Sequence, residues 1–180
     1  GSFNPPHNGH VNSLTTVQKK MGFDKIHIIP NSQNPLKIQT EAPAPEHRIE
    51  MARLAFSTYG KAFVIDDREL KRGGKSYTID TIKELRKEHE SKNLYLIIGA
   101  DNFETFSEWK DYKKILEEVN LVVTTRPGYE IPESEDEWPD YLNGMVAESD
   151  FGALELTTGR SVEFITLEDM DISSSELRKK

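Results

Sequence analysis

Short apolar runs rich in β-branched residues recur along the chain, and amphipathic segments separate them. The runs lie at residues 25–29, 62–65, 94–98, 121–124 and 162–167. Near-continuous apolar runs of this length are typical of strands covered on both faces, as in a parallel sheet. The segments 11–21, 46–56, 77–89 and 109–119 instead place their apolar residues at helical spacing. This alternation predicts an α/β fold with a single doubly wound, mostly parallel sheet and helices on both faces.

The domain organisation follows from the length. A chain of 180 residues suits one domain spanning residues 1–180 better than two. A doubly wound sheet normally has a central strand ahead of its first ligand loop, so we expect further apolar residues before Gly1; the alternative is that Gly1 and Ser2 are a remnant of cloning. Segment 30–45 is polar and proline-rich, which indicates a binding loop. Segment 127–159 holds an acidic run and one weak helix pattern at 140–148.

The composition excludes several functional classes. The formal net charge of -8 offers no broad positive surface for a nucleic acid. The absence of cysteine excludes disulfides, thiolate zinc sites and cysteine nucleophiles, and fits a reducing compartment. No apolar stretch approaches the roughly 20 residues of a spanning helix. We therefore expect a cytoplasmic protein that binds neither nucleic acid nor membrane; a homo-oligomer stays open.

The first ten residues place a turn-forming segment directly before a predicted helix. His7 and His10 lie three positions apart, so in a first helical turn their side chains point the same way. Gly9 between them leaves room beside the backbone. The N–H groups of a helix start favour an anion, and two imidazoles there predict a phosphate site. Metal binding through the histidine pair is the alternative, but no neighbouring carboxylate or third histidine completes a ligand set.

A second helix start is predicted at the carboxyl end, near Ser174. Ser173 or Ser174 can act as N-cap, Glu176 falls in the first turn, and Arg178 follows. Hydroxyls and free N–H groups with an arginine close by suit a polyphosphate. Alone, this pattern is also that of an ordinary capped helix.

Together, His-x-Gly-His near one end and Ile-Ser-Ser-x-x-x-Arg near the other resemble the nucleotidyltransferase superfamily, which has a Rossmann-like fold. The chain is most similar to the bacterial nicotinate-nucleotide adenylyltransferases. Ser-Tyr-Thr-x-Asp-Thr at 76–81 and Arg-Pro-Gly-Tyr at 126–129 mark that branch. Further shared segments lie at 48–55, 98–101 and 106–109.

The resemblance implies a binding site for ATP, with the phosphates held by the two end motifs and the ribose by residues at a strand end. The implied ATP-binding residues are Ser2, Phe3, His7, His10, Gly99, Asp101, Ser173, Ser174 and Arg178. Among them His7, His10 and Arg178 would be catalytic. An aspartate that accepts hydroxyl hydrogens suits a ribose.

The resemblance also implies a mononucleotide site. Asn31, Lys37 and Arg126 would meet the phosphate and ribose, while Thr78 and Trp109 would surround the nicotinate ring. Trp109 offers a flat face for stacking, although plain core packing is the alternative for this side chain. Two positions depart from the commoner family pattern: Leu36 replaces a histidine, which puts that histidine's role in doubt, and Asn4 replaces an aspartate.

The implied reaction transfers the adenylyl group of ATP to nicotinate mononucleotide and releases pyrophosphate. Mg²⁺ is the implied cofactor, bound mainly through ATP phosphates, and no protein residue is assigned as a metal ligand. Nicotinamide mononucleotide or pantetheine phosphate as the acceptor, and a catalytically silent nucleotide-binding regulator, stay open. Gly73, Gly74 and Ser76 suggest a P-loop, but that motif needs a glycine where Glu69 stands.

Overall fold

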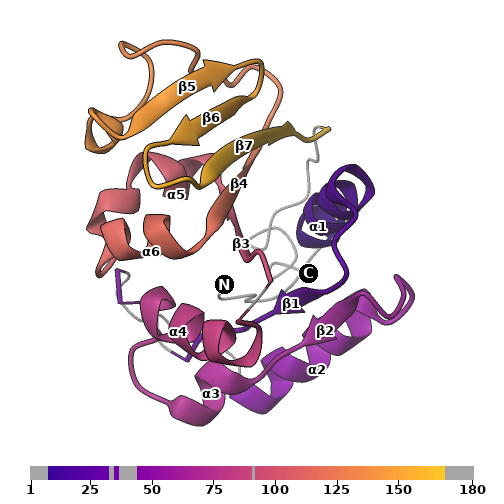
Figure 1. The fold of residues 1–180 in the computed structure, drawn as a ribbon. Helices are drawn as coiled ribbons and strands as arrows, with labels where there is room; N and C mark the ends of the chain where they lie inside the picture. Colours follow the sequence, from indigo (N-terminus) through magenta and orange to yellow (C-terminus); the bar gives the residue numbers. More distant parts are fainter. Residues whose placement is uncertain (1–7, 33–34, 37–43, 91, 169–180) are drawn as a thin grey trace. The chain divides into compact units, whose positions relative to one another are not determined.

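The structure is a computed structural model that describes residues 8–32, 35–36, 44–90 and 92–168. Contacts divide the chain into two compact units: the first unit is 1–76 with 170–180, and the second unit is 77–169. Figure 1 labels the elements of both. The elements of the first unit are α1 (Asn8–Met21), β1 (Ile26–Ile28), α2 (Pro45–Phe56), β2 (Phe63–Ile65) and α3 (Arg68–Arg72). Those of the second unit are α4 (Thr78–Glu88), β3 (Tyr95–Gly99), α5 (Ala100–Glu104), η1 (Phe106–Glu108), α6 (Tyr112–Glu118), β4 (Asn120–Thr125), η2 (Asp140–Leu142), β5 (Val146–Asp150), β6 (Ala153–Leu156) and β7 (Ser161–Thr166).

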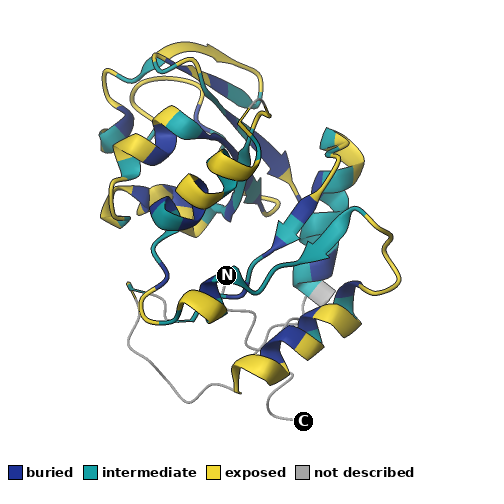
Figure 2. Cartoon of the chain, turned by 60° about the horizontal axis from the view of Figure 1, so that its bottom comes forward, coloured by how far each residue is buried: buried dark blue, intermediate teal, exposed yellow. Residues whose placement is uncertain are grey.

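The first unit is built on a parallel pair of strands. Ile26 of β1 pairs with Phe63 of β2, and α2 joins the two strands and packs against β2. The buried side of α2 includes Ala52 and Phe56, and the Phe56 ring stacks on Phe63 at 5.4 Å between centroids. Figure 2 shows this division of the helices into buried and exposed faces. Phe56 also packs in one cluster with Ile28 of β1, and burying a phenylalanine side chain contributes about 1.5–3 kcal/mol.

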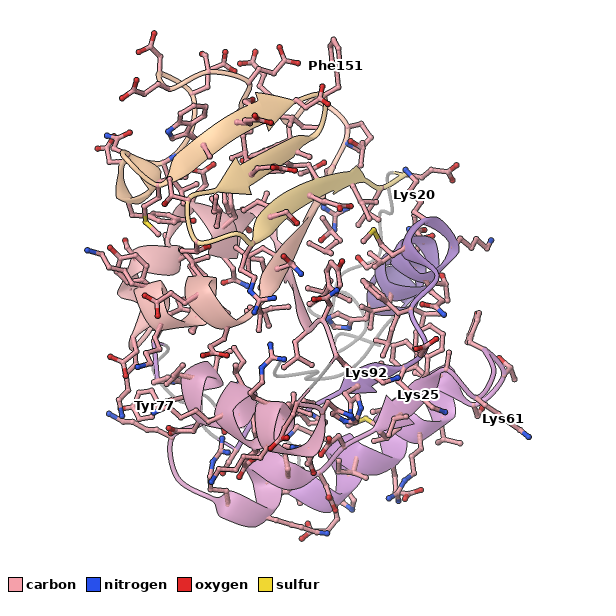
Figure 3. All side chains as sticks on the ribbon, in the orientation of Figure 1. Lys20, Lys25, Lys61, Tyr77, Lys92 and Phe151 are labelled. Carbon is pink, nitrogen blue, oxygen red and sulfur yellow. The ribbon has the colours of Figure 1, made fainter. Side chains whose placement is uncertain are left out.

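The second unit contains a five-stranded sheet in the order β3-β4-β7-β6-β5. The strands β3, β4 and β7 run parallel, whereas β6 and β5 pair antiparallel as a hairpin beside β7. Its core includes the fully buried Phe103, Phe106 and Leu121. The two-residue turn of the hairpin places Phe151 in solvent at 93% exposure (Figure 3).

The α/β class with parallel strands and helices is confirmed, and each predicted strand is found to within two residues of its expected ends. The described strands form two sheets, one in each unit, where we expected a single sheet. The expected helix at 140–148 is wrong: η2 is followed by β5, because residues 146–150 pair with β6. The N-cap of α4 is Tyr77, and the hydroxyl of the preceding Ser76 accepts a hydrogen bond from the backbone N–H of Ser32.

Candidate functional site

Three parallel strands of the second unit end at one edge of its sheet. Gly99 at the end of β3 is in register with Thr124 of β4, and Thr125 is in register with Thr166 of β7. Ligands of open α/β sheets bind beyond the carboxyl ends of the strands. Three predicted site residues, Gly99, Asp101 and Arg126, lie at this edge, since each is at a strand end or within two residues after one.

Gly99 links β3 to α5 with ordinary extended backbone, φ -82° and ψ 166°. A Cβ built on Gly99 would meet no described heavy atom within 4 Å, so the space beside this backbone is open. Asp101 lies in the first turn of α5, and its side chain is exposed. Phe103 is completely buried on the same short helix and so anchors it to the core. An open glycine and an exposed carboxylate at a strand end can accept a hydroxylated ligand.

The Arg-Pro-Gly-Tyr segment forms a tight turn directly after β4. The N–H of Tyr129 donates to the carbonyl of Arg126 at 3.1 Å, and Gly128 adopts φ 94°, the left-handed conformation required at the third position of a type II turn. The Tyr129 hydroxyl donates to Oε1 of Glu104 in α5 at 2.7 Å. Burial and the Glu104 carboxylate raise the pKa of Tyr129, so the phenol keeps its proton. The turn thus leaves Arg126 exposed at the sheet edge.

Thr78 and Trp109 come from adjoining segments of the second unit. Nζ of Lys110 lies 4.5 Å from the ring centroid of Tyr77, a cation–π contact that brings residues 77–78 beside residues 109–110. Thr78 is the first residue of α4. The Trp109 ring packs on Phe106 at 4.8 Å between centroids, so one part of it belongs to the core. Its Nε1 is buried and has no hydrogen-bond acceptor among the residues that the structure describes.

In the first unit, His10 and Asn31 are the predicted site residues that the structure describes. His10 is the third residue of α1 and is half-buried. Asn31 follows β1, and its backbone carbonyl accepts a hydrogen bond from Nη1 of Arg48 at 2.7 Å. Arg48 is buried, and desolvation lowers the pKa of its guanidinium. The sequence motifs assign no role to Arg48, although helical spacing within 46–56 places it on the same face as Ala52, four residues on.

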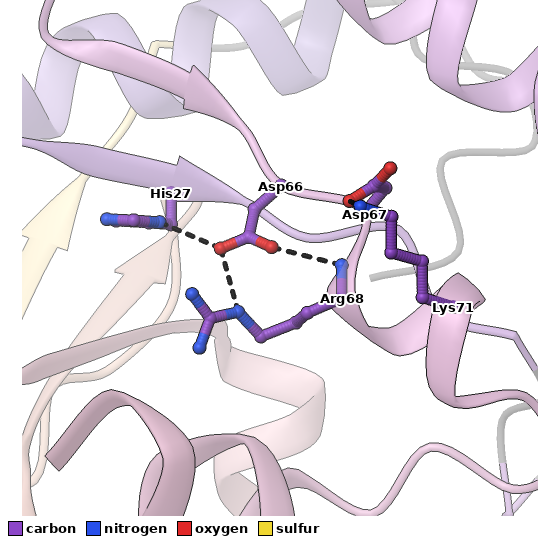
Figure 4. A network of polar contacts seen from close by, with 5 residues as sticks. All are labelled: His27, Asp66, Asp67, Arg68 and Lys71. Atoms are coloured by element: carbon purple, nitrogen blue, oxygen red, sulfur yellow. Dashed lines mark hydrogen bonds and ion pairs between the residues drawn. The ribbon is translucent and has the colours of Figure 1, made fainter. Parts of the chain in front are cut away.

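A second polar network, which sequence analysis missed, lies at the end of β2 (Figure 4). Oδ2 of Asp66 accepts a hydrogen bond from Nδ1 of His27 at 3.0 Å and another from Nε of Arg68 at 2.8 Å. Burial alone would raise the pKa of Asp66, but hydrogen bonds from the Arg68 backbone and from His27, with the guanidinium charge, outweigh burial and lower it. The network joins β1 to the start of α3 and thereby fixes the loop after β2.

The remaining predicted site residues, Ser2, Phe3, His7, Lys37, Ser173, Ser174 and Arg178, lie outside the described residues, as does the helix expected near Ser174. The last described residue, Glu168, follows β7, which ends at the same sheet edge as β3 and β4. Within the described part of the chain, no three His, Asp or Glu side chains gather as a metal would require. No described helix is long and apolar enough to cross a membrane.

A family model described as cytidylyltransferase-like matches residues 1–180, the whole chain. The chain belongs to the cytidylyltransferase-like family. A relative from Oceanobacillus iheyensis is 39% identical over 180 residues, which cover 100% of this chain and 80% of the relative. A relative from Rhodopirellula baltica is 34% identical over 182 residues, covering 100% of this chain and 78% of the relative. Both relatives are named probable nicotinate-nucleotide adenylyltransferase, so this chain lies in that branch of the family.

Among solved structures, the Plasmodium falciparum nicotinic acid mononucleotide adenylyltransferase in complex with NaAD has a TM-score of 0.70 to this chain. The match covers 99% of this chain and 80% of the other, at 21% sequence identity. At that identity the likeness establishes the fold. It agrees with the nucleotidyltransferase fold that the end motifs imply.

Proposed function

We infer that this chain is a nicotinate-nucleotide adenylyltransferase, which transfers the adenylyl group of ATP to nicotinate mononucleotide and releases pyrophosphate. The observation that carries this conclusion is full-length similarity at 34–39% identity to relatives of that name. The sheet edge with Gly99, Asp101 and Arg126 supports it, since nucleotides bind at such an edge. The reaction belongs to the biosynthesis of NAD, and we expect the enzyme in the cytoplasm.

The resemblance assigns residues of the two end motifs and of the end of β3 to the proposed ATP site. Asp101 would accept hydrogen bonds from the ribose hydroxyls beside Gly99, while His7 and His10 would donate to the phosphates with Ser173, Ser174 and Arg178. Ser2 and Phe3 would complete the site. His7, His10 and Arg178 carry the chemistry in this proposal, because their donors face the charge that the leaving pyrophosphate gains.

In the proposed reaction the phosphate of nicotinate mononucleotide attacks the α-phosphorus of ATP in line. A new P–O bond forms, the bond to the β-phosphate oxygen breaks, and pyrophosphate leaves with that electron pair. The attacking phosphate is already ionised, so no general base is needed. Since two anions must be brought together, positioning and positive charge supply most of the acceleration.

The resemblance assigns two groups of residues to the acceptor. Asn31, Lys37 and Arg126 would hold its phosphate and ribose, and Thr78 and Trp109 its ring. The contact between Tyr77 and Lys110 supports a shared site for Thr78 and Trp109, since it aligns their segments. Arg126 supports a phosphate contact because it is an exposed cation at a strand end.

Mg²⁺ is the proposed cofactor. It prefers near-octahedral oxygen ligands, keeps several waters and commonly binds through substrate phosphates. In this mode the residues proposed to hold the ATP phosphates would position the ion through those phosphates. When bound, the ion would neutralise phosphate charge; the chain's own residues would orient the nucleotide around it.

The acid specificity of the enzyme is directly testable. We expect pyrophosphate release with ATP and nicotinate mononucleotide to be at least about tenfold more efficient in kcat/KM than with nicotinamide mononucleotide, since a charge-assisted contact to the ring carboxylate is worth more than about 1.4 kcal/mol. A coupled pyrophosphate assay compares the two acceptors at fixed ATP. Equal efficiency with both would contradict acid specificity, and no release with either would contradict the proposed function.

Replacement of Gly99 by alanine tests the ATP site. The backbone at Gly99 accepts a side chain and no described atom obstructs a Cβ, so the free energy of unfolding should change by less than about 0.5 kcal/mol. The added methyl group would enter the space proposed for the ribose, which should raise the KM for ATP by about tenfold. The KM for nicotinate mononucleotide in the same variant is the internal control. An unchanged KM for ATP in the folded variant would remove Gly99 from the site.

A further inference from the structure

Two buried polar side chains hold the backbone that follows β1. Nη1 of Arg48 donates to the carbonyl of Asn31 at 2.7 Å, and Oγ of Ser76 accepts the N–H of Ser32 at 2.8 Å. Arg48 is 5% exposed and Ser76 is 7% exposed. Both contacts lie within the first unit. Arg48 is 17 positions from Asn31 and Ser76 is 44 positions from Ser32, so two segments distant in the sequence fix two consecutive residues.

Burying the charged side chain of Arg48 costs free energy, and an apolar side chain at this position of α2 would avoid that cost. Its neighbours on the buried side of α2, including Ile49 and Ala52, are apolar. Desolvation lowers the pKa of the Arg48 guanidinium, because burial disfavours its charged form. Replacing a buried charged group by a well-packed apolar one is often neutral or stabilising. The hydrogen bonds from Arg48 to Asn31 offset part of this cost and tie α2 to the segment after β1.

Arg48 also sets the direction of the Asn31 side chain. A longer contact of 3.5 Å joins Nη1 of Arg48 to Oδ1 of Asn31. A guanidinium only donates hydrogen bonds, so the amide must turn its oxygen toward Arg48 and its Nδ2 donor group away from it. Nδ2 is the donor group of this amide, and a donor suits a phosphate or hydroxyl oxygen. An asparagine without this restraint would present its oxygen as readily as its nitrogen.

We propose that Arg48 and Ser76 are positioning residues for the acceptor mononucleotide, which hold Asn31 and Ser32 so that the Asn31 amide donates to the phosphate or ribose of that substrate. The proposal rests on the proposed function for the identity of the substrate. It adds to that function a reason why the acceptor site depends on α2 and on the segment before α4. Neither residue touches the reacting atoms in this proposal.

Kinetics of Arg48 variants test the proposal. Arg48→Met should raise the KM for nicotinate mononucleotide by about tenfold or more, since a hydrogen bond to a charged group contributes about 1.5–3 kcal/mol. The KM for ATP should change by less than about twofold, and Arg48→Lys should recover part of the loss because its ammonium can still reach a carbonyl. The control is Arg53→Met on the same helix, where Arg53 is exposed and pairs with Glu50 at 2.6 Å. Equal increases in both KM values, or none, would overturn the proposal.

A second measurement tests the contacts without any substrate. The N–H of Ser32 should exchange with solvent at least about tenfold faster in Ser76→Ala than in the wild type, measured by NMR hydrogen exchange, because the acceptor is gone. Ser57→Ala is the matched control, since Ser57 Oγ donates to Leu54 on the exposed side of α2. Unchanged exchange at Ser32 would refute the contact itself. If the proposed function were wrong, the wild-type protein would release no pyrophosphate. That outcome is distinct from unchanged exchange at Ser32.

Discussion

The His10→Ala variant should lose turnover by about 10²–10³, the magnitude found when one preorganised donor is removed from a charged transition state. His10 is the third residue of α1, where backbone N–H groups lack helical acceptors and the helix dipole favours an anion. No acidic residue occupies the first turn of α1, so the helix itself does not oppose a phosphate there. The measurement is kcat for pyrophosphate release at saturating ATP and nicotinate mononucleotide.

A matched control separates this role from a general effect of histidine loss. His47 is the third residue of α2 and is exposed, so His47→Ala makes the same chemical change at the same helical position. It should retain turnover within about twofold. Alanine is the better helix former, so His10→Ala should not unfold α1. A His10→Ala enzyme with nearly full turnover would exclude His10 from the catalytic groups.

Hydrophobic periodicity located the strands and the main helices because it depends on local spacing. The run 94–98, for example, became β3, since Ile98 and its neighbours pack in one core with Leu121 of β4. The β5–β6 hairpin was missed because its strand β5 is largely exposed and acidic, with Glu148 and Asp150 where apolar alternation would have marked a strand. Pairing with β6, a contact beyond the local pattern, decides that structure.

The site residues likewise divide into those that the local sequence predicts and those that depend on tertiary contacts. Gly99 directly follows an apolar run and Arg126 lies two residues after one, so their positions at strand ends could be predicted from sequence, while their site roles came from the resemblance. Arg48 and Ser76 could not, since their roles depend on the tertiary contacts with Asn31 and Ser32. Ser76 in particular has the sequence context of an N-cap, yet its hydroxyl accepts a hydrogen bond from the chain after β1. Side-chain chemistry alone does not distinguish these two uses.

The Phe103→Ala variant should have a free energy of unfolding lower by about 3–5 kcal/mol, the range for truncating a fully buried phenylalanine. Phe103 is 0% exposed and meets Phe164 of β7 edge-to-face at 5.3 Å between centroids. It also contacts the Tyr141 ring, so its loss leaves a cavity with two aromatic walls. For a chain of this length the melting temperature should fall by roughly 10 °C, as measured by circular dichroism.

Phe151→Ala is the control, because the same truncation at a 93% exposed position should change the free energy of unfolding by less than about 0.5 kcal/mol. Phe103 also anchors α5, the short helix that carries Asp101 at the edge where β3 ends. Below its lowered melting temperature, Phe103→Ala should therefore show a raised KM for ATP while Phe151→Ala shows none. If Phe103→Ala lost stability but bound ATP as the wild type does, the position of Asp101 would not depend on the packing of α5. The nucleotide would then be held by the two end motifs without the end of β3.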